Sequence, residues 1–124
     1  MAKKILIVDD DKQIVLLLVS RLKANKYEIV AAYDAVQAVA KAFSDKPDLI
    51  LLDIKMPAGG GISVMDNLRN APDTAVIPVI VITAYPSLEI QQKAKEMDAV
   101  GFISKPFKAE DVLLKIKKAL GETS

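Results

Sequence analysis

Three short segments of the chain, residues 5–8, 49–52 and 79–82, contain only apolar side chains. A strand with one face in water alternates apolar and polar residues, whereas a continuous apolar run of this length is typical of a parallel strand covered on both faces. Two weaker runs, residues 27–32 and 101–104, fit the flanking strands of the same sheet. The pattern predicts five parallel strands.

Helical periodicity marks the longer segments that follow each of these strands. The predicted helices are residues 12–25, 35–44, 62–70, 88–97 and 109–120. Asp11 is placed to cap the first helix, and Asp34 with Gln37 three residues later has the spacing of a capping box. Strand and helix therefore alternate five times, which predicts an α/β fold with an open, doubly wound (βα)5 sheet.

The length of 124 residues suits one domain, and no linker, repeat or low-complexity block divides the chain. The predicted core runs from about residue 3 to residue 120, so we interpret residues 1–124 as a single domain with no second domain after it. The longest apolar runs are far shorter than the roughly 20 residues of a membrane span. We expect a cytoplasmic protein without membrane contact.

The charge balance and the missing residue types exclude several classes of protein. There are 17 basic and 16 acidic residues, and a net charge of +1 argues against direct binding of nucleic acid. The chain has no cysteine and no histidine, which excludes disulfides, thiolate nucleophiles and the commonest zinc ligands. Any chemistry must therefore use carboxylates, hydroxyls or lysine.

Such groups stand directly after the predicted strands, where a doubly wound sheet binds its ligands. They are Asp9, Asp10, Asp53, Thr83 and Lys105. Two carboxylates about 5 Å apart repel each other by ~3 kcal/mol at an effective dielectric near 20, a cost that a bound cation offsets. An all-oxygen site selects Mg²⁺ or Mn²⁺, and such a cation favours phosphoryl transfer. Each of these residues alone is equally explained as a loop or capping side chain. The hypothesis of a cation and phosphoryl site depends on their joint position at the strand ends.

Four segments at these strand ends carry motifs: ILIVDD (residues 5–10), LLDIKMP (51–57), VITA (81–84) and KPF (105–107). They resemble the acidic first turn, the phosphoacceptor turn, the switch strand and the lysine turn of the response-regulator receiver family of two-component signalling. The resemblance covers essentially the whole chain. It implies a flavodoxin-like, CheY-like strand order of 2-1-3-4-5 and a single-domain receiver without an output domain.

By this resemblance, Asp53 accepts the phosphoryl group from a partner histidine kinase or histidine phosphotransfer protein. Lys105 would pair with the phosphoryl oxygens, aided by a cis peptide before Pro106, and the Thr83 hydroxyl would bond to the same group. The switch of the family couples this threonine to an aromatic residue of the fifth strand, here Phe102, which has no hydroxyl. An ordinary core aromatic is the alternative explanation of Phe102.

The resemblance also implies a ligand set for Mg²⁺. Asp10 and Asp53 would ligate the ion directly, together with the backbone carbonyl of Lys55. Asp9 would act largely through water. Mn²⁺ is an alternative ion for the same oxygen ligands.

The first predicted helix is apolar all round over residues 14–19, although a helix on one face of a sheet buries only one stripe. Ile14 with Leu17 or Leu18 would form an apolar patch that docks the phosphodonor protein. Packing of these side chains against the last helix is the alternative.

We therefore predict a signalling phosphoacceptor that acts on a downstream protein target and is a monomer or weak dimer. It is not an enzyme beyond its own phosphorylation and dephosphorylation. A receiver-like scaffold that works by binding alone is the main alternative. A phosphohydrolase of the haloacid-dehalogenase type is a weaker one, because Gln13 stands where its motif requires Thr or Val.

Overall fold

The structure is a computed structural model that describes residues 2–54, 60–84 and 87–122. The strands are β1 (Lys4–Val8), β2 (Glu28–Ala32), β3 (Leu49–Asp53), β4 (Val79–Thr83) and β5 (Gly101–Ser104). The helices are α1 (Lys12–Ala24), α2 (Ala35–Asp45), α3 (Gly60–Arg69), α4 (Pro72–Ala75), α5 (Leu88–Glu96) and α6 (Ala109–Ala119). All strand pairs are parallel, and the sheet has the order β2-β1-β3-β4-β5. The predicted fold class and strand order are confirmed.

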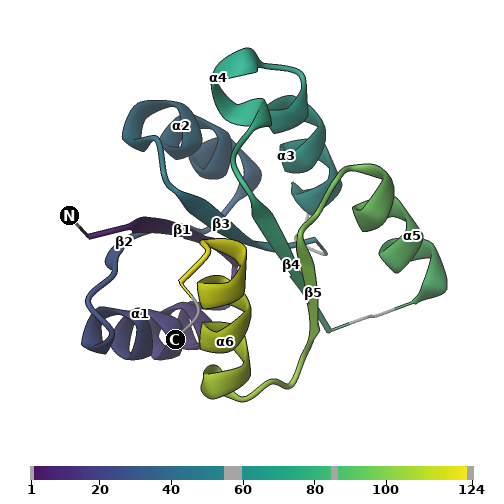
Figure 1. The fold of residues 1–124 in the computed structure, drawn as a ribbon. Coiled ribbons are helices and arrows are strands. Elements are labelled where there is room, and N and C mark those ends of the chain that lie inside the picture. Colours follow the sequence, from purple (N-terminus) through teal and green to yellow (C-terminus); the bar gives the residue numbers. More distant parts are fainter. Residues whose placement is uncertain (1, 55–59, 85–86, 123–124) are drawn as a thin grey trace.

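Helices cover both faces of the sheet, with α1 and α6 on one side and α2, α3 and α5 on the other (Figure 1). The central strands are buried on both faces, as their continuously apolar sequences predict. In β1, for example, Leu6 and Val8 pack under α2 and α3, whereas Ile5 and Ile7 pack under α1 and α6. Successive side chains of a strand point to opposite faces of the sheet, so β1 contributes apolar side chains to the two layers in turn.

The predicted helix caps are present. The Asp11 carboxylate accepts hydrogen bonds from the backbone N–H groups of Gln13 and Ile14, at 2.9 and 3.4 Å. The Asp34 carboxylate accepts from the Gln37 N–H at 2.8 Å, and the Gln37 side chain accepts from the Tyr33 N–H at 3.0 Å. In a standard capping box the reciprocal bond comes from the N–H of the capping residue itself. Here it comes from the N–H of the residue before Asp34.

The short helix α4 was not predicted. It has four residues, too few to show helical periodicity, and it begins with a proline, whose fixed φ suits a first helical position. The buried Thr74 hydroxyl donates a 2.7 Å hydrogen bond to the Leu68 carbonyl, which ties α4 to α3.

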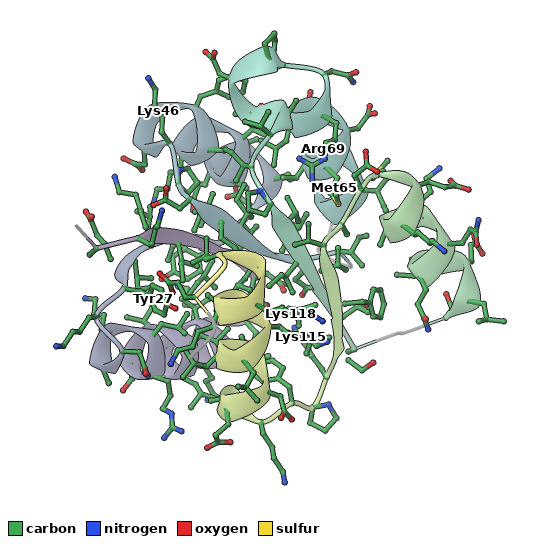
Figure 2. All side chains as sticks on the ribbon, in the orientation of Figure 1. Tyr27, Lys46, Met65, Arg69, Lys115 and Lys118 are labelled. Carbon is green, nitrogen blue, oxygen red and sulfur yellow. The ribbon has the colours of Figure 1, made fainter. Side chains whose placement is uncertain are left out.

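Arg69, the last residue of α3, joins backbone segments that precede β4 and β5 (Figure 2). Its Nε donates to the Met97 carbonyl, and its Nη1 donates to the carbonyls of Ala75 and Ile77, each at 2.9 Å. These carbonyls lie outside the regular hydrogen bonds of the sheet. A single partly buried guanidinium therefore satisfies several of them and holds α3, α4 and the end of α5 together.

Replacing Arg69 with Met should lower the free energy of unfolding by about 2–4 kcal/mol, because carbonyl groups would lose their donor while the apolar stem is kept. Arg21→Met is the matched control, since Arg21 forms an exposed 2.7 Å ion pair with Glu110 and should cost no more than about 1 kcal/mol. Urea denaturation of both variants measures the difference. Equal losses would show that the Arg69 contacts add no stability.

Candidate functional site

Three carboxylates meet at the carboxyl edge of the sheet. Asp9 directly follows β1, Asp10 comes next, and Asp53 is the last residue of β3, the neighbour of β1. A carboxylate oxygen from each lies within 4.8 Å of those from the other two. Asp9 and Asp53 are buried and Asp10 is exposed, so the group is open to solvent on one side only.

Lys105 brings a positive charge to this group from the far side of β4. It follows β5, and its backbone N–H donates a 2.8 Å hydrogen bond to the Thr83 carbonyl. Its Nζ lies 2.8 Å from Asp9 Oδ2 and 3.1 Å from Asp53 Oδ2. The peptide bond that follows, Lys105–Pro106, is cis, in agreement with the expectation.

The charges in this cluster shift one another's pKa values. Burial raises the pKa of Asp9, and so does the charge of Asp53, against the lowering effect of the hydrogen bonds from Lys105 and from the Asp11 N–H. Burial by itself lowers the pKa of Lys105, but the hydrogen bonds and charges of Asp9 and Asp53 outweigh it and raise that pKa. Lys105 is thus held charged at neutral pH between two carboxylates.

Thr83 ends β4 and is buried beside the acidic group. Asp53 pairs in register with Ile82, so Thr83 lies one residue further toward the carboxyl edge on the neighbouring strand. The structure therefore brings Thr83, Asp53 and Lys105 to one edge of the sheet from three successive strands. The sequence motif predicted this grouping.

Gly61, near the start of α3, allows the helix to approach the end of β3 closely. A Cβ atom at this position would lie 2.1 Å from the Ile54 Cα and 2.6 Å from the Asp53 carbonyl oxygen. Both contacts are far below van der Waals distance, and both involve backbone. The sequence did not predict this role of Gly61, because the approach of α3 to β3 is not visible in the sequence.

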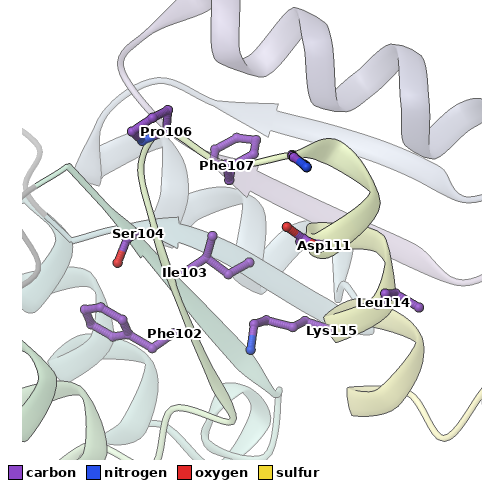
Figure 3. A pocket seen from close by; sticks show the side chains of 9 residues that line it. Phe102, Ile103, Ser104, Pro106, Phe107, Asp111, Leu114 and Lys115 are labelled. Carbon is purple, nitrogen blue, oxygen red and sulfur yellow. The ribbon is translucent and has the colours of Figure 1, made fainter.

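Phe102 lies in β5 opposite Val81 of β4, two residues before the level of Thr83. Its ring is partly buried and packs against the core layer that contains α5. One hollow of about 700 Å³ lies between β5 and α6 (Figure 3). Another of about 500 Å³ lies between α5 and β5, and Phe102 lines both. The ring thus stands between two open spaces on the outer side of the sheet.

The predicted docking patch on α1 needs a correction. Leu18 is only 1% exposed and packs in the core against the sheet, so it cannot contribute to an exposed surface. Leu17 is 48% exposed and Ile14 is half-buried, whereas Leu16, which we did not assign to the patch, is 70% exposed. The sequence could not resolve these neighbours because every residue in this stretch is apolar.

The chemistry of the donor set fits a hard divalent cation. Asp9, Asp10 and Asp53 offer only oxygen ligands. Two of them are buried, and among the described residues Lys105 is the one lysine that forms ion pairs with them. The predicted fourth ligand, the backbone carbonyl of Lys55, lies outside the described residues. The ion pair between Lys105 and Asp9 was not predicted, because the resemblance assigned Lys105 only to the phosphoryl group.

Lys105→Met should lower the free energy of unfolding by about 2–4 kcal/mol at neutral pH without added metal, because it leaves two buried carboxylates without their cation. The native state would then hold a proton on Asp9 to higher pH than the unfolded chain does, so stability should fall more steeply from pH 4 to pH 7 than in the wild type. Urea denaturation across this pH range tests both effects, with the exposed Lys118→Met as control. An unchanged pH slope would contradict the electrostatic role of Lys105.

Comparison with known proteins agrees with this geometry. The family model for the response regulator receiver domain matches residues 5–117. The chain is 36% identical over 120 residues to the alkaline phosphatase synthesis transcriptional regulatory protein PhoP of Bacillus subtilis, covering 97% of this chain and 49% of PhoP. It is 40% identical over 114 residues to the response regulator PleD of Caulobacter vibrioides, covering 92% of this chain and 25% of PleD. The chain therefore spans half or less of the length of these relatives.

Solved structures give the same result. A CheY-like response regulator receiver domain protein from Methanospirillum hungatei superposes with a TM-score of 0.92 and 33% identity, covering 98% of this chain and 96% of the other. The chemotaxis response regulator CheY4 of Vibrio cholerae superposes with a TM-score of 0.90 and 30% identity, covering 97% of this chain and 100% of the other. The chain belongs to the family of response regulator receiver domains, which are signalling phosphoacceptors of two-component systems rather than classical enzymes.

Proposed function

We propose that this chain accepts a phosphoryl group on Asp53 from a phosphohistidine of a partner protein and converts it into a change of its own surface. The supporting observation is the position of Asp53: its buried carboxylate lies within 4.8 Å of those of Asp9 and Asp10 and 3.1 Å from Lys105 Nζ. Receiver domains of response regulators interact with histidine kinases and with downstream targets. The 124 residues contain no histidine, so this domain does not itself supply the phosphodonor histidine.

In this reaction one carboxylate oxygen of Asp53 attacks phosphorus. A P–O bond forms while the P–N bond of the protonated phosphohistidine breaks, and the imidazole leaves neutral, so the chain supplies no proton. The Lys105 ammonium lies where it can neutralise charge on the transferring oxygens. The Thr83 hydroxyl would donate a hydrogen bond to one of them.

Receiver domains bind Mg²⁺ at an acidic pocket, and the three carboxylates described above correspond to such a pocket. Asp10 and Asp53, with the Lys55 carbonyl, would hold Mg²⁺ or Mn²⁺, and Asp9 would act through a water molecule. When bound, the cation supplies positive charge that offsets the charge of the transferring phosphoryl oxygens. The same residues would serve self-dephosphorylation, in which water attacks the acyl phosphate.

The surface change would involve Thr83 and Phe102. Movement of Thr83 toward the phosphoryl group opens space behind it, and the Phe102 ring can turn inward from the hollows on either side of it. Because Phe102 has no hydroxyl, this coupling would work through packing alone. The surface that changes is formed by α5, β5 and α6, and the downstream protein target would bind there.

The phosphodonor protein would dock on α1, which begins next to the acidic group. Leu17 and the half-buried Ile14 give this helix an exposed apolar surface close to Asp10.

None of the helices in the described part of the chain has both the length and the apolar character to cross a membrane. We propose that the protein is cytoplasmic, because histidine kinases present their phosphodonor there. The interpretation of residues 1–124 as a single domain stays a prediction.

Incubation with Mg²⁺ and acetyl phosphate should add one phosphoryl group to the wild type, seen as a single mass increase of the intact protein. Asp53→Asn should abolish this adduct because it removes the nucleophilic carboxylate. Asp66→Asn, an exposed change on α3, should retain it and serves as the matched control. Absence of an adduct with acetyl phosphate and with a phosphorylated histidine protein would favour the binding scaffold instead.

Mg²⁺ should stabilise the folded protein, because only the folded state brings the three carboxylates together. At a concentration of Mg²⁺ tenfold above its dissociation constant, the gain is about 1.4 kcal/mol, or roughly 4 °C in melting temperature. Asp10→Asn removes a proposed ligand from an exposed position and should lose most of this shift, whereas Asp66→Asn should keep it. If millimolar Mg²⁺ does not change the melting temperature of the wild type, the proposed metal site is contradicted.

A further inference from the structure

The buried Asp9 side chain is held at both of its carboxylate oxygens. Oδ2 forms the ion pair with Lys105 described above, and Oδ1 accepts a 2.9 Å hydrogen bond from the backbone N–H of Asp11. The Asp9 backbone N–H in turn donates to the Ala32 carbonyl of β2 at 3.2 Å. Three separate contacts therefore fix Asp9, and the one from Asp11 comes from the start of α1.

Asp11 is at the same time the N-cap of α1. One oxygen of its carboxylate accepts the hydrogen bonds of the Gln13 and Ile14 N–H groups, and its carbonyl accepts from the Val15 N–H at 3.1 Å. Its backbone is extended, with φ −84° and ψ 104°, as is usual for an N-cap. Because the capping bonds fix this backbone, they also fix the direction of the Asp11 N–H that reaches Asp9.

The Asp11 carboxylate lies outside the acidic group. Among the described residues, the carboxylates with oxygens within 4.8 Å of one another are those of Asp9, Asp10 and Asp53. The Asp11 side chain is engaged instead with the first turn of α1. The direct contact between Asp11 and the acidic group is thus made by its backbone, and its side chain sets where that backbone lies.

We propose that Asp11 is a positioning residue for the acidic group: its side chain caps α1 and thereby aims its own N–H at Asp9 Oδ1. This role rests on the proposed function, in which Asp9 helps to hold Mg²⁺ through a water molecule. Groups that orient a metal ligand typically contribute about 10–100-fold to metal affinity, because they hold the ligand in its binding orientation. The capped turn of α1 does this for Asp9.

A purely electrostatic role for Asp11 is the competing explanation, since a further carboxylate next to Asp10 also attracts a cation. The two roles need different properties of the side chain. Capping needs a short side chain that accepts a hydrogen bond, and Asn meets this requirement about as well as Asp does. Electrostatic attraction needs only a negative charge, which Glu keeps. Asp11→Asn and Asp11→Glu therefore separate the two roles.

Isothermal titration calorimetry with Mg²⁺ alone measures the affinity without any phosphodonor. Asp11→Ala should raise the dissociation constant of Mg²⁺ by about three- to tenfold, less than a fully lost contact because the N–H itself remains. Asp11→Asn should bind Mg²⁺ within about twofold of the wild type, since it keeps the cap. Asp11→Glu should resemble Asp11→Ala.

Asp34→Ala is the matched control for the loss of a helix cap. It removes the N-cap of α2, where the Asp34 carboxylate accepts a 2.8 Å hydrogen bond from the Gln37 N–H. Both Ala variants should lower the melting temperature by roughly 3–6 °C. Only Asp11→Ala should also weaken Mg²⁺ binding, which a general effect of an uncapped helix would not explain.

Hydrogen exchange of the residue 11 N–H, followed by NMR in the absence of metal, reports the same contact independently of Mg²⁺. Relative to the intrinsic rate of each sequence, exchange should be at least about fivefold faster in Asp11→Ala than in the wild type, because the N–H no longer stays on Asp9. Asp11→Asn and Asp34→Ala should leave this exchange unchanged.

Equal Mg²⁺ affinity of Asp11→Ala and the wild type would overturn the inference. A loss in Asp11→Asn as large as that in Asp11→Ala would also overturn it, because the effect would then belong to the charge. If the wild type binds no Mg²⁺, the proposed metal site fails, and the exchange of the residue 11 N–H decides the inference by itself. Unchanged exchange in Asp11→Ala would show that the cap does not hold this N–H against Asp9.

Discussion

The ion pairs of Lys105 with Asp9 and Asp53 are the interaction on which the rest of the site depends. Carboxylates from two neighbouring strands are buried at one edge of the sheet, and their mutual repulsion would oppose folding without a cation between them. Lys105 comes from the loop after β5, and β4 lies between β5 and β3. The lysine therefore neutralises the two carboxylates only when the sheet is complete. Folding and the proposed phosphoryl chemistry therefore rest on the same charge balance.

That balance is possible because the sheet holds its strand ends in one place. The central strands are apolar on both faces, and the two helical layers cover them completely, which leaves the carboxyl edge as the point where polar side chains gather. Gly61 adds a local condition, because only a residue without a Cβ lets α3 pass so close to the backbone of Asp53. The acidic group is thus positioned mainly by backbone packing.

Apolar side chains are exposed at different surfaces of the same small fold. The exposed apolar residues of α1 stand beside the acidic group, while Phe102 lies between two hollows near α5 and α6. The proposed docking surface for the phosphodonor and the proposed switch region are thus formed by different elements of the fold.

The sequence by itself determined the strands, most helix starts, the fold class and the residues at the strand ends, because these depend on local periodicity, capping and the motifs after each strand. It did not reveal α4, which is too short for periodicity, or that Leu18 is buried while Leu16 is exposed in a uniformly apolar stretch. Only the tertiary structure decided the Lys105–Asp9 ion pair and the approach of α3 at Gly61. The ion pair joins segments far apart in the chain, and the approach at Gly61 depends on how α3 packs against the end of β3, so neither distance can be read from the local sequence.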